Sequence, residues 1–495
     1  MSVSRFRKES DMYPCITALF RYVEDAIDRS SAADDIKRRL KVYSKSDATP
    51  DGADDYRRID IGLTFKRKLP DDDVNDDASD ELDELDELNE PNYNDMLAVI
   101  EAKRLISEQT RAYQQMYIYT RNVYPEQHNR RFVWGFTFCA SVVRACILGH
   151  DNVFSSLDMD VSTDEGLKAF VKLAVDMTFC ESDQLGYDPN ISYNLESDRW
   201  EIAMYDEKSQ QQVIYHLRYV AQNADRVFGR HTRCFICREI KPLPEDENEN
   251  ENENIGSDDN NNNGDSASYS EAVLASDHQH QNQHRYDKND FLIKDAWPHA
   301  ETSSKSDQGK ERDEIEILRT INEILGNDPD LQNKYPQLIS AGVVRQFCGS
   351  ERMPTKDTTE HIYAGIDPDI IKSIPQRIHK RIAMKPLGLS LREVRSVDEL
   401  IIAAADVMEV HQAILRRCDI LHRDLSPYNM LMTRDSDGMV HGMLIDFDCA
   451  VWASDEDSQP RANMTGTLPF MSIANLEELE IKRTSLDDWE SLIYI

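Results

Sequence analysis

Two short polar clusters, each enclosed by apolar residues, constrain the fold of this chain more than any other feature. The first contains Asp424 and, five residues later, Asn429, and the second contains Asp446. A carboxylate in such a loop can orient a hydroxyl group for attack, while an amide and a second carboxylate can hold a magnesium ion. The apolar neighbours predict short buried strands that deliver these side chains to one cleft, namely Ile420–Leu421, Met430–Met432 and Met443–Ile445.

The order of these side chains resembles the active site of protein kinases. Residues His422–Asn429 match the catalytic-loop pattern H-R-D-L-x-x-x-N, and Asp446–Phe447 match the start of the D-F-G metal-binding turn. Asp and Asn are also frequent in ordinary turns, but two such motifs in this order are hard to obtain by chance. The resemblance implies that Asp424 is the catalytic base and that Asn429 and Asp446 bind magnesium at the ATP phosphates.

A kinase also needs a lysine on a strand to hold the phosphates and a helix glutamate to hold that lysine. The short apolar run Phe291–Lys294 predicts such a strand, and Lys310–Leu325 predicts an amphipathic helix that ends at Gly326. Glu314 lies on the apolar face of this helix, where an unpaired carboxylate would be costly. We therefore expect Lys294 and Glu314 to pair, the alternative being that both are exposed surface charges.

The loop expected to cover the phosphates is the weakest element of the pattern. The segment Val227–Phe235 contains only Gly229 where G-x-G-x-x-G is typical. Alone it would pass for an ordinary hairpin turn, but it precedes Lys294 in the expected order. We therefore assign Gly229 to nucleotide binding.

Three further segments fit the same arrangement. Ser396–Glu399 is a capping box that predicts a helix leading into the catalytic loop, with His411 on its apolar stripe as a core residue. Thr465–Phe470 resembles a substrate-docking loop. Asp487–Leu492 resembles the start of the helix that anchors the catalytic loop, with Asp488 as the buried anchor.

Five stretches together resemble the fungal-type protein kinase family: HRDLSPYNMLM, LIDFDCAVW, TGTLPFM, LDDWESLIYI and FLIKDAW. The resemblance is most specific from about Asp419 to the end, and it extends more loosely back to about Arg130. It implies a bilobal protein-kinase-like fold, ATP and magnesium as cofactors, and a serine or threonine hydroxyl of a protein as the phosphate acceptor.

Three departures from the kinase pattern bear on activity. Ser426 stands where Ser/Thr kinases carry a lysine that neutralises the transferring phosphate, and Asp448 replaces the glycine of D-F-G. The sequence also stops at Ile495, inside the helix opened by Asp488, so the C-terminal lobe is expected to be truncated or minimal. These departures allow low activity or none.

Asp60, Glu101 and Lys103 form a second candidate site. Their pattern, D…E-x-K, resembles the PD-(D/E)XK core of restriction-endonuclease-like proteins. The resemblance implies that Asp60 and Glu101 hold magnesium and that Lys103 helps to activate water. Glu101 and Lys103 are two residues apart on a predicted strand and so share one face. The pattern is short, and the alternative is a structural αβ domain that packs on the kinase.

The length of 495 residues favours about three regions in an α+β protein. We expect a helical N-terminal segment at 1–50 and an αβ domain at 51–205 with an acidic loop at 71–90. The kinase-like domain is expected at 206–495, with a disordered insertion at 241–288. Both acidic tracts lack the apolar content needed for a packed core.

The formal net charge of −35 argues against a general binder of the nucleic-acid backbone, which needs clustered Lys and Arg. Much of this charge falls in the two acidic tracts, which are solvated loops or docking sites for a basic protein partner. A histidine patch follows the second tract, where weak metal binding is the alternative to no function; it comprises His278, His280 and His284.

The sequence favours an intracellular protein, either cytoplasmic or nuclear, with no membrane partner. No apolar run approaches the roughly 20 residues of a membrane helix, and the charged N-terminus has no secretory h-region. The nine cysteines are scattered, as in a reducing compartment. The C-x-x-C of Cys234 and Cys237 has no second pair at zinc spacing, so both are expected to be structural.

The leading hypothesis is an ATP- and magnesium-dependent protein Ser/Thr kinase with a protein substrate. The first alternative is a pseudokinase scaffold whose acidic tracts recruit basic partners. The second is a kinase-like domain that regulates an N-terminal nuclease, and only this alternative gives the protein a nucleic-acid partner. A small-molecule phosphotransferase shares the catalytic logic, but Arg423 and Gly466–Pro469 suit a protein substrate better.

Overall fold

The computed structural model describes most of the chain, and the statements below concern that part. Two predicted features lie outside it: the acidic loop at 71–90 and, except for Asp287, the insertion at 241–288. Asp60 and the histidine patch also lie outside it. The described residues are 8–28, 40–44, 61–65, 93–150, 152–206, 211–222, 229–239, 287, 289–300, 313–346, 355–435, 438–454, 466–477 and 483–495.

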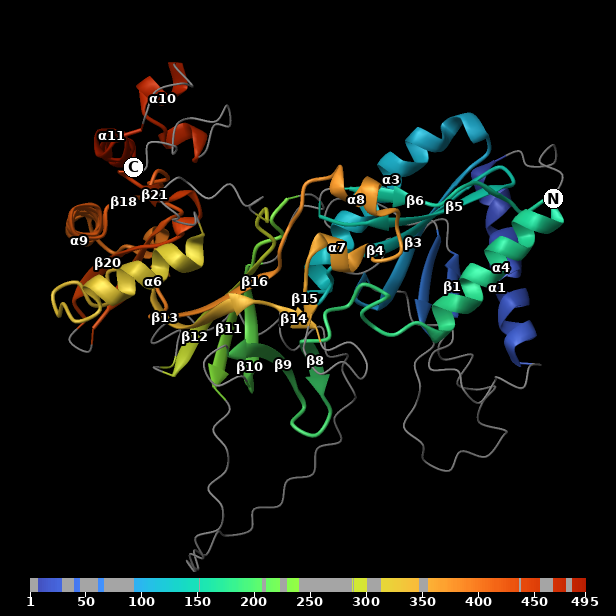
Figure 1. The fold of residues 1–495 in the computed structure, drawn as a ribbon, viewed down its shortest axis with the longest axis horizontal. Helices are drawn as coiled ribbons and strands as arrows, with labels where there is room; N and C mark the ends of the chain where they lie inside the picture. Colours follow the sequence, from blue (N-terminus) through green and yellow to red (C-terminus); the bar gives the residue numbers. More distant parts are fainter. Residues whose placement is uncertain are drawn as a thin grey trace, which may run out of the picture.

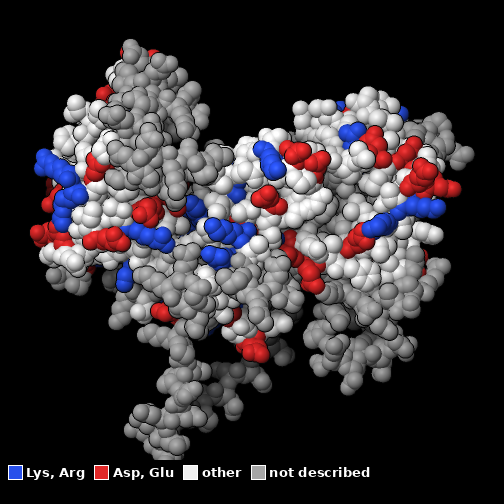
Figure 2. Space-filling model, viewed as in Figure 1, with Lys and Arg blue, Asp and Glu red and all other residues white. Residues whose placement is uncertain are grey.

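The fold is α+β, with two large sheets that follow one another along the long axis of the molecule (Figure 1). Helix α1 (Tyr13–Asp28) lies at one end of this axis and helix α11 (Ser485–Ile493) at the other. On the face viewed in Figure 2, the described Lys and Arg side chains alternate with Asp and Glu and form no continuous basic patch. Among the described residues, no helix combines the length and apolar character that a membrane crossing requires.

The first sheet is mixed, with strand order β1-β2-β3-β4-β5-β6 and β7 beside β5. Only β3 and β4 run parallel, because α3 (Gln109–Glu126) connects them as a crossover, and the other pairs are antiparallel. The strands are β1 (Leu40–Ser44), β2 (Ile61–Phe65), β3 (Met96–Lys103), β4 (Val133–Cys139), β5 (Val142–Leu148), β6 (Val153–Ser155) and β7 (Met159–Asp160).

Helices cover both faces of the first sheet. Helices α1 and α4 (Asp164–Phe179) pack on one face, where Phe20 contacts the rings of Phe136 and Phe170. Helix α3 packs on the other face, against Val99 and Val133. The helix expected within residues 1–50 is present as α1, but residues 40–44 form β1, so this segment also supplies an edge strand.

The second sheet has strand order β13-β16-β12-β11-β10-β9-β8, and every pair in it is antiparallel. Helix α6 (Glu314–Leu325) packs beside β13. The boundary expected between residues 205 and 206 falls inside this sheet, at the last residue of β9, which pairs with β10. The strands are β8 (Ile191–Asn194), β9 (Arg199–Asp206), β10 (Gln211–Gln222), β11 (Arg233–Glu239), β12 (Asp290–Ala296), β13 (Gln337–Val343) and β16 (Lys380–Lys385).

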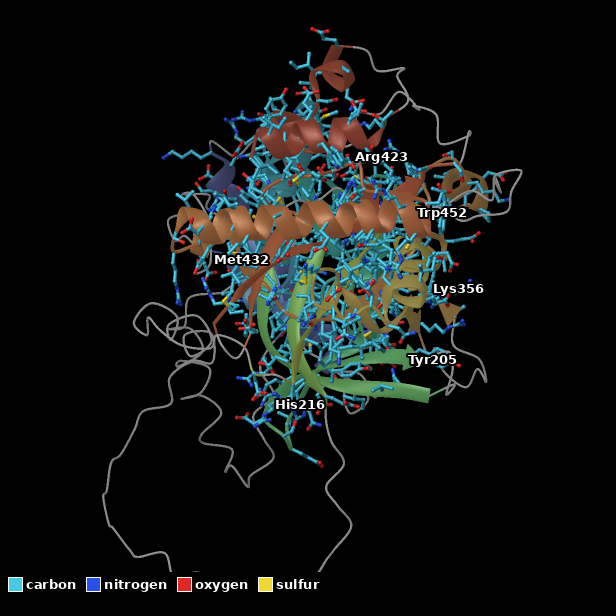
Figure 3. All side chains as sticks on the ribbon, turned by 90° about the vertical axis from the view of Figure 1, so that its left-hand side faces the viewer. Tyr205, His216, Lys356, Arg423, Met432 and Trp452 are labelled. Carbon is cyan, nitrogen blue, oxygen red and sulfur yellow. The ribbon has the colours of Figure 1, made fainter. Side chains whose placement is uncertain are left out.

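The C-terminal lobe is built around helix α9 (Val397–Ala413), which crosses in front of Met432 and Trp452 when the molecule is seen from that end (Figure 3). Ser396 caps its N-terminus by accepting a hydrogen bond from the Glu399 N–H, as the capping box predicts. The lobe also contains β17 (Leu389–Ser390), β18 (Ile420–Leu421), β19 (Met430–Arg434), β20 (Val440–Leu444), β21 (Val451–Trp452), α10 (Ile473–Glu477) and α11.

The connection between β13 and β16 of the second sheet crosses back onto the first sheet. It carries β14 (Arg345–Gln346), β15 (Thr355–Lys356), α7 (Thr359–Ile362) and α8 (Pro368–Lys372), and it lies beside the first sheet in Figure 1. The ring of Tyr363 packs on that of Phe154, with centroids 4.4 Å apart. The two sheets are therefore joined by packed side chains as well as by the chain itself.

A fully buried group of ions lies at this junction. The two ring nitrogens of His379 lie 2.9 Å from Asp357 and 2.8 Å from Asp295, and Asp295 also accepts a hydrogen bond from Arg381 at 2.7 Å. Arg381 in turn pairs with Asp188. Asp188, Asp295 and His379 are close enough to hold a metal ion, but their ligand atoms already bond to partners of opposite charge. We therefore interpret the group as an ion-pair network.

Candidate active site

The catalytic loop predicted from the sequence connects β18 to β19 and brings Asp424 next to Asn429. The amide nitrogen of Asn429 donates to Oδ2 of Asp424 at 3.0 Å and to its carbonyl oxygen at 2.9 Å. The backbone of Arg423 has a φ of 69°, a conformation that non-glycine residues adopt mainly where the surroundings enforce it. The loop therefore holds the carboxylate and the amide in one fixed arrangement.

The predicted docking loop closes over the same carboxylate. Both the N–H and the hydroxyl of Thr467 donate to Oδ1 of Asp424 at 2.9 Å. Gly466 has a φ of +115°, and a Cβ there would lie 3.3 Å from the carbonyl oxygen of Arg423. Glycine is needed at this position because the two loops approach so closely.

A small pocket lies beside Asp424. Its walls come from the catalytic loop, the docking loop, α10 and α11, and they include Arg423, Thr467, Arg483 and Asn475. Lys294, Asn429 and Asp446 do not line it, so the pocket is separate from the predicted magnesium and phosphate ligands.

Asp488 anchors the catalytic loop from α11. Its Oδ2 accepts a hydrogen bond from the backbone N–H of Arg423 at 3.1 Å and lies 2.8 Å from Nε2 of His411. Both His411 and Asp488 are buried. His411 is thus a core histidine paired with a carboxylate, and the geometry of Asp488 agrees with the anchoring role expected from the sequence.

The metal-binding turn lies directly beside the catalytic loop. The N–H of Ile445 donates to the carbonyl oxygen of Asn429 at 3.0 Å, and Nε2 of His422 donates to the carbonyl oxygen of Ile445 at 2.9 Å. Phe447 is buried against the ring of His422, with centroids 4.9 Å apart. Asp446 itself has a φ of 64°. These contacts fix the backbone from which the Asp446 carboxylate projects.

Lys294 connects the second sheet to this turn. Its Nζ donates to both carboxylate oxygens of Glu314 at 2.9 Å and to Oδ1 of Asp446 at 2.7 Å. Strand β12 supplies Lys294 and helix α6 supplies Glu314. The structure therefore brings together the lysine, the helix glutamate and the metal-turn carboxylate that the sequence analysis selected.

Asp448, at the position of the usual glycine, joins the same group of charges. Its Oδ2 lies 3.1 Å from Nζ of Lys294, and it also pairs with Arg230. Carboxylate oxygens of Glu314, Asp446 and Asp448 all lie within 4.8 Å of one another. Oxygen donors at this density are the ligands that magnesium prefers, so the residues present fit a magnesium ion.

Burial and mutual repulsion set the protonation of this group. Burial and the nearby Asp448 carboxylate raise the pKa of Glu314 well above its ordinary value, although Lys294 opposes the shift. Burial alone would raise the pKa of Asp448, but Lys294 and Arg230 outweigh it and lower that pKa. Burial also opposes the charge of Lys294, yet Asp446, Asp448 and Glu314 raise its pKa well above the usual value. Lys294 therefore stays charged, and Glu314 holds a proton more readily than Asp448.

The predicted phosphate-covering loop is described from Gly229 onward. Gly229 has a φ of +123°, and no atom lies within 4 Å of where its Cβ would be. The next residue, Arg230, reaches across to Asp448. No role for Arg230 could be expected from the sequence, since its partner Asp448 lies far along the chain.

The second candidate site is only partly described. Glu101 and Lys103 lie on β3, each 1% exposed, and the lysine Nζ is 2.5 Å from Oε1 of Glu101 and 3.2 Å from Oε2 of Glu9. Burial opposes the charge of Lys103, but these two carboxylates raise its pKa. Asp60 lies outside the described residues. The structure thus places Glu101 and Lys103 together as a buried ion pair.

Cys234 and Cys237 lie on β11, and every cysteine in the described part of the chain is a free thiol. Burial raises the pKa of both thiols. Protonated thiols are poor nucleophiles and poor metal ligands. The geometry is that of structural cysteines.

Comparison with known proteins agrees with this geometry. No curated protein matches the chain. The family model described as fungal protein kinase matches residues 76–495, a span that includes the second sheet, the C-terminal lobe and the part of the first sheet from β3 onward. Because this match covers most of the sequence, the chain belongs to the fungal protein kinase family.

Proposed function

We propose that this protein is an ATP- and magnesium-dependent protein kinase that transfers the γ-phosphate to a serine or threonine hydroxyl of a protein. One observation carries the proposal. Lys294 bonds at once to Glu314 at 2.9 Å and to Asp446 at 2.7 Å. Kinases require this lysine–glutamate pair together with the metal-turn aspartate.

The roles of the side chains follow from their positions. Lys294, on β12 of the second sheet, binds phosphate oxygens. Asp446 and Asn429 offer oxygen ligands for magnesium from two adjacent loops. A magnesium ion bound there neutralises phosphate charge. Asp424 accepts the proton of the attacking hydroxyl, and its orientation is set by hydrogen bonds from Asn429 and Thr467.

The surroundings of Asp424 support a protein acceptor. The loop that resembles a substrate-docking loop lies against the catalytic carboxylate, because the N–H and the hydroxyl of Thr467 both donate to Oδ1 of Asp424. An extended peptide bound along this loop would present a serine or threonine hydroxyl next to Asp424.

The test compares wild-type protein with Asp424→Asn, using labelled ATP, magnesium and a generic basic protein as acceptor. Loss of a positioned base should lower phosphate incorporation by about 10²–10⁴-fold. Asp330→Asn is the matched control, because Asp330 is an exposed carboxylate in the turn between α6 and β13; its activity should equal wild type. Equal incorporation by wild type and Asp424→Asn would reject the proposal.

The pseudokinase scaffold is the alternative that a specific observation favours. Ser426 is completely buried, and its hydroxyl has no hydrogen-bond partner among the described residues. Because a serine stands at this position, no lysine side chain from here can neutralise the transferring phosphate. MgATP binding without any transfer in the assay above would support this alternative.

The structure offers less support for a nuclease in the N-terminal region. The ammonium of Lys103 already contacts two carboxylates, and Glu101 is buried beside it. A water-activating site needs access for a nucleic-acid backbone. Lys103 also contacts Glu9 of η2 (Glu9–Met12). We infer that Glu101 and Lys103 help η2 to pack on β3.

A further inference from the structure

An ion pair between Arg230 and Asp448 joins the phosphate-covering loop to the metal-binding turn. The arginine side chain is 42% exposed, whereas that of Asp448 is 17% exposed. A guanidinium carries five N–H donors, and this ion pair uses Nη1. The other N–H groups of the Arg230 guanidinium can therefore bind a second negatively charged group on its exposed side.

The backbone on both sides fixes the direction of the Arg230 side chain. The N–H of Gly229 donates to the carbonyl oxygen of His150 at 2.7 Å, and the carbonyl oxygen of Arg230 accepts from the N–H of Trp297 at 2.7 Å. The rings of His150 and Trp297 stack, with centroids 4.3 Å apart. Because the loop is tied down at two points, Arg230 extends into the cleft rather than across the surface.

The charges at this site leave a role for a second cation. Glu314, Asp446 and Asp448 bring three carboxyl groups close together, and Lys294 contacts all three. A nucleoside triphosphate adds further negative charge, and Ser426 contributes none of the positive charge expected from a lysine. Arg230 precedes β11, the strand that pairs with the Lys294 strand, and its guanidinium interacts electrostatically with both Asp448 and Asp446.

We propose that Arg230 binds the terminal phosphates of ATP and that Asp448 positions its guanidinium for this contact. The inference rests on the proposed function, since it assumes a nucleotide at Lys294 and Asp446. Arginine forms paired hydrogen bonds to phosphate with a geometry that lysine cannot reproduce. In this protein the loop then contributes a charged side chain where other kinases rely on glycine N–H groups.

The first experiment measures affinities of ATP, ADP and adenosine by calorimetry with magnesium present. Arg230→Ala should weaken ATP binding by roughly 10- to 100-fold, the usual range for a lost charge-assisted hydrogen bond. Adenosine binding should be unchanged, and Arg230→Lys should restore part of the loss. Arg238→Ala is the matched control, because Arg238 lies at the far end of β11 and pairs with Asp290; it should bind ATP like wild type.

The second experiment tests Asp448 with a double-mutant cycle. Asp448→Asn should weaken ATP binding more in the wild-type background than when Arg230 is already alanine, and the difference measures the positioning of Arg230. Fully additive losses would overturn the positioning role of Asp448. Equal ATP affinities of wild type and Arg230→Ala, or equal losses for ATP and adenosine, would overturn the role of Arg230. Absence of any nucleotide binding by wild type would instead reject the proposed function, and this inference with it.

Discussion

Arg131 donates a hydrogen bond to Asp357 at 2.9 Å across 226 residues of sequence, and both side chains are buried. Arg131 precedes β4 of the first sheet, while Asp357 belongs to the connection that leads into β16 of the second. Through His379 the same carboxylate contacts Asp295, the neighbour of Lys294 on β12. Three hydrogen bonds, from Arg131 through Asp357 and His379 to Asp295, thus link the first sheet to the strand that bears the phosphate-binding lysine.

Removing one partner of this pair should destabilise the whole protein. Arg131→Ala leaves the buried Asp357 carboxylate without one of its cationic partners, and breaking such a pair costs about 3–5 kcal/mol of unfolding free energy. Denaturant unfolding is the measurement. Arg111→Ala serves as the control, because that exposed arginine pairs only with Glu108 on the surface, and its change should stay within about 0.5 kcal/mol. Similar stabilities for both variants would contradict the prediction.

The stability of the protein should fall as the pH rises from about 6.5 to 9. Burial alone would lower the pKa of His379, but Asp295 and Asp357 raise it to about 9. When the pKa of a histidine is higher in the folded than in the unfolded protein, its charged form stabilises the fold. This stabilisation is complete at a pH below the unfolded pKa and is lost as the pH rises through the folded pKa. With 1.36 kcal/mol for each pKa unit, the contribution is roughly 3 kcal/mol.

His379→Gln isolates this effect. The variant should be less stable than wild type at pH 6, and its unfolding free energy should change less between pH 6.5 and 9. The control is His441→Gln, because His441 is partly exposed near the start of β20 and does not belong to the network. A wild-type stability that is flat over this pH range would refute the assigned protonation.

Asp446→Ala should remove most of the magnesium dependence of ATP binding. The Asp446 carboxylate contacts Lys294, as do those of Glu314 and Asp448, and it belongs with them to the oxygen-rich group. We expect wild type to bind ATP at least about 10-fold more tightly with magnesium than with EDTA, a difference of about 1.4 kcal/mol. The variant should show little difference between the two conditions. Unchanged magnesium dependence would place the metal elsewhere.

Gly466→Ala should slow phosphate transfer while leaving ATP binding nearly intact. An alanine at a φ of +115° is strained by about 1–3 kcal/mol, and its Cβ presses on the Arg423 carbonyl next to the catalytic Asp424. Initial rates with a peptide acceptor should fall by roughly 10-fold or more. Gly365→Ala is the matched control, because no atom lies within 4 Å of its Cβ position.

Much of the candidate site could be predicted from the sequence, because its parts are encoded locally. Asp424 and Asn429 are five residues apart in one loop, and Glu314 stands out as an acid on an otherwise apolar helix face. The strands β12, β18 and β19 were likewise expected from their apolar runs. Each of these signals depends on neighbours within a few residues.

The remainder depends on pairings between distant residues, for which a single sequence carries no local signal. Arg131 and Asp357 are one example, and Arg230 and Asp448 are another. The domain boundary expected between residues 205 and 206 divides a single sheet, because the local pattern of a strand such as β9 does not reveal which sheet it joins. Propensity determines the type of an element, but only tertiary packing determines its partner.

Strand β12 carries Lys294 toward the phosphate cleft and Asp295 toward the buried ion network, as the alternation of a strand requires. A deletion or insertion of one residue in this strand would exchange the two faces. It would bring a carboxylate to the phosphates and a lysine among Arg381, Arg233 and His379. Substitutions at either residue would damage one function each, whereas a single-codon length change would disable the cleft and the junction between the sheets together.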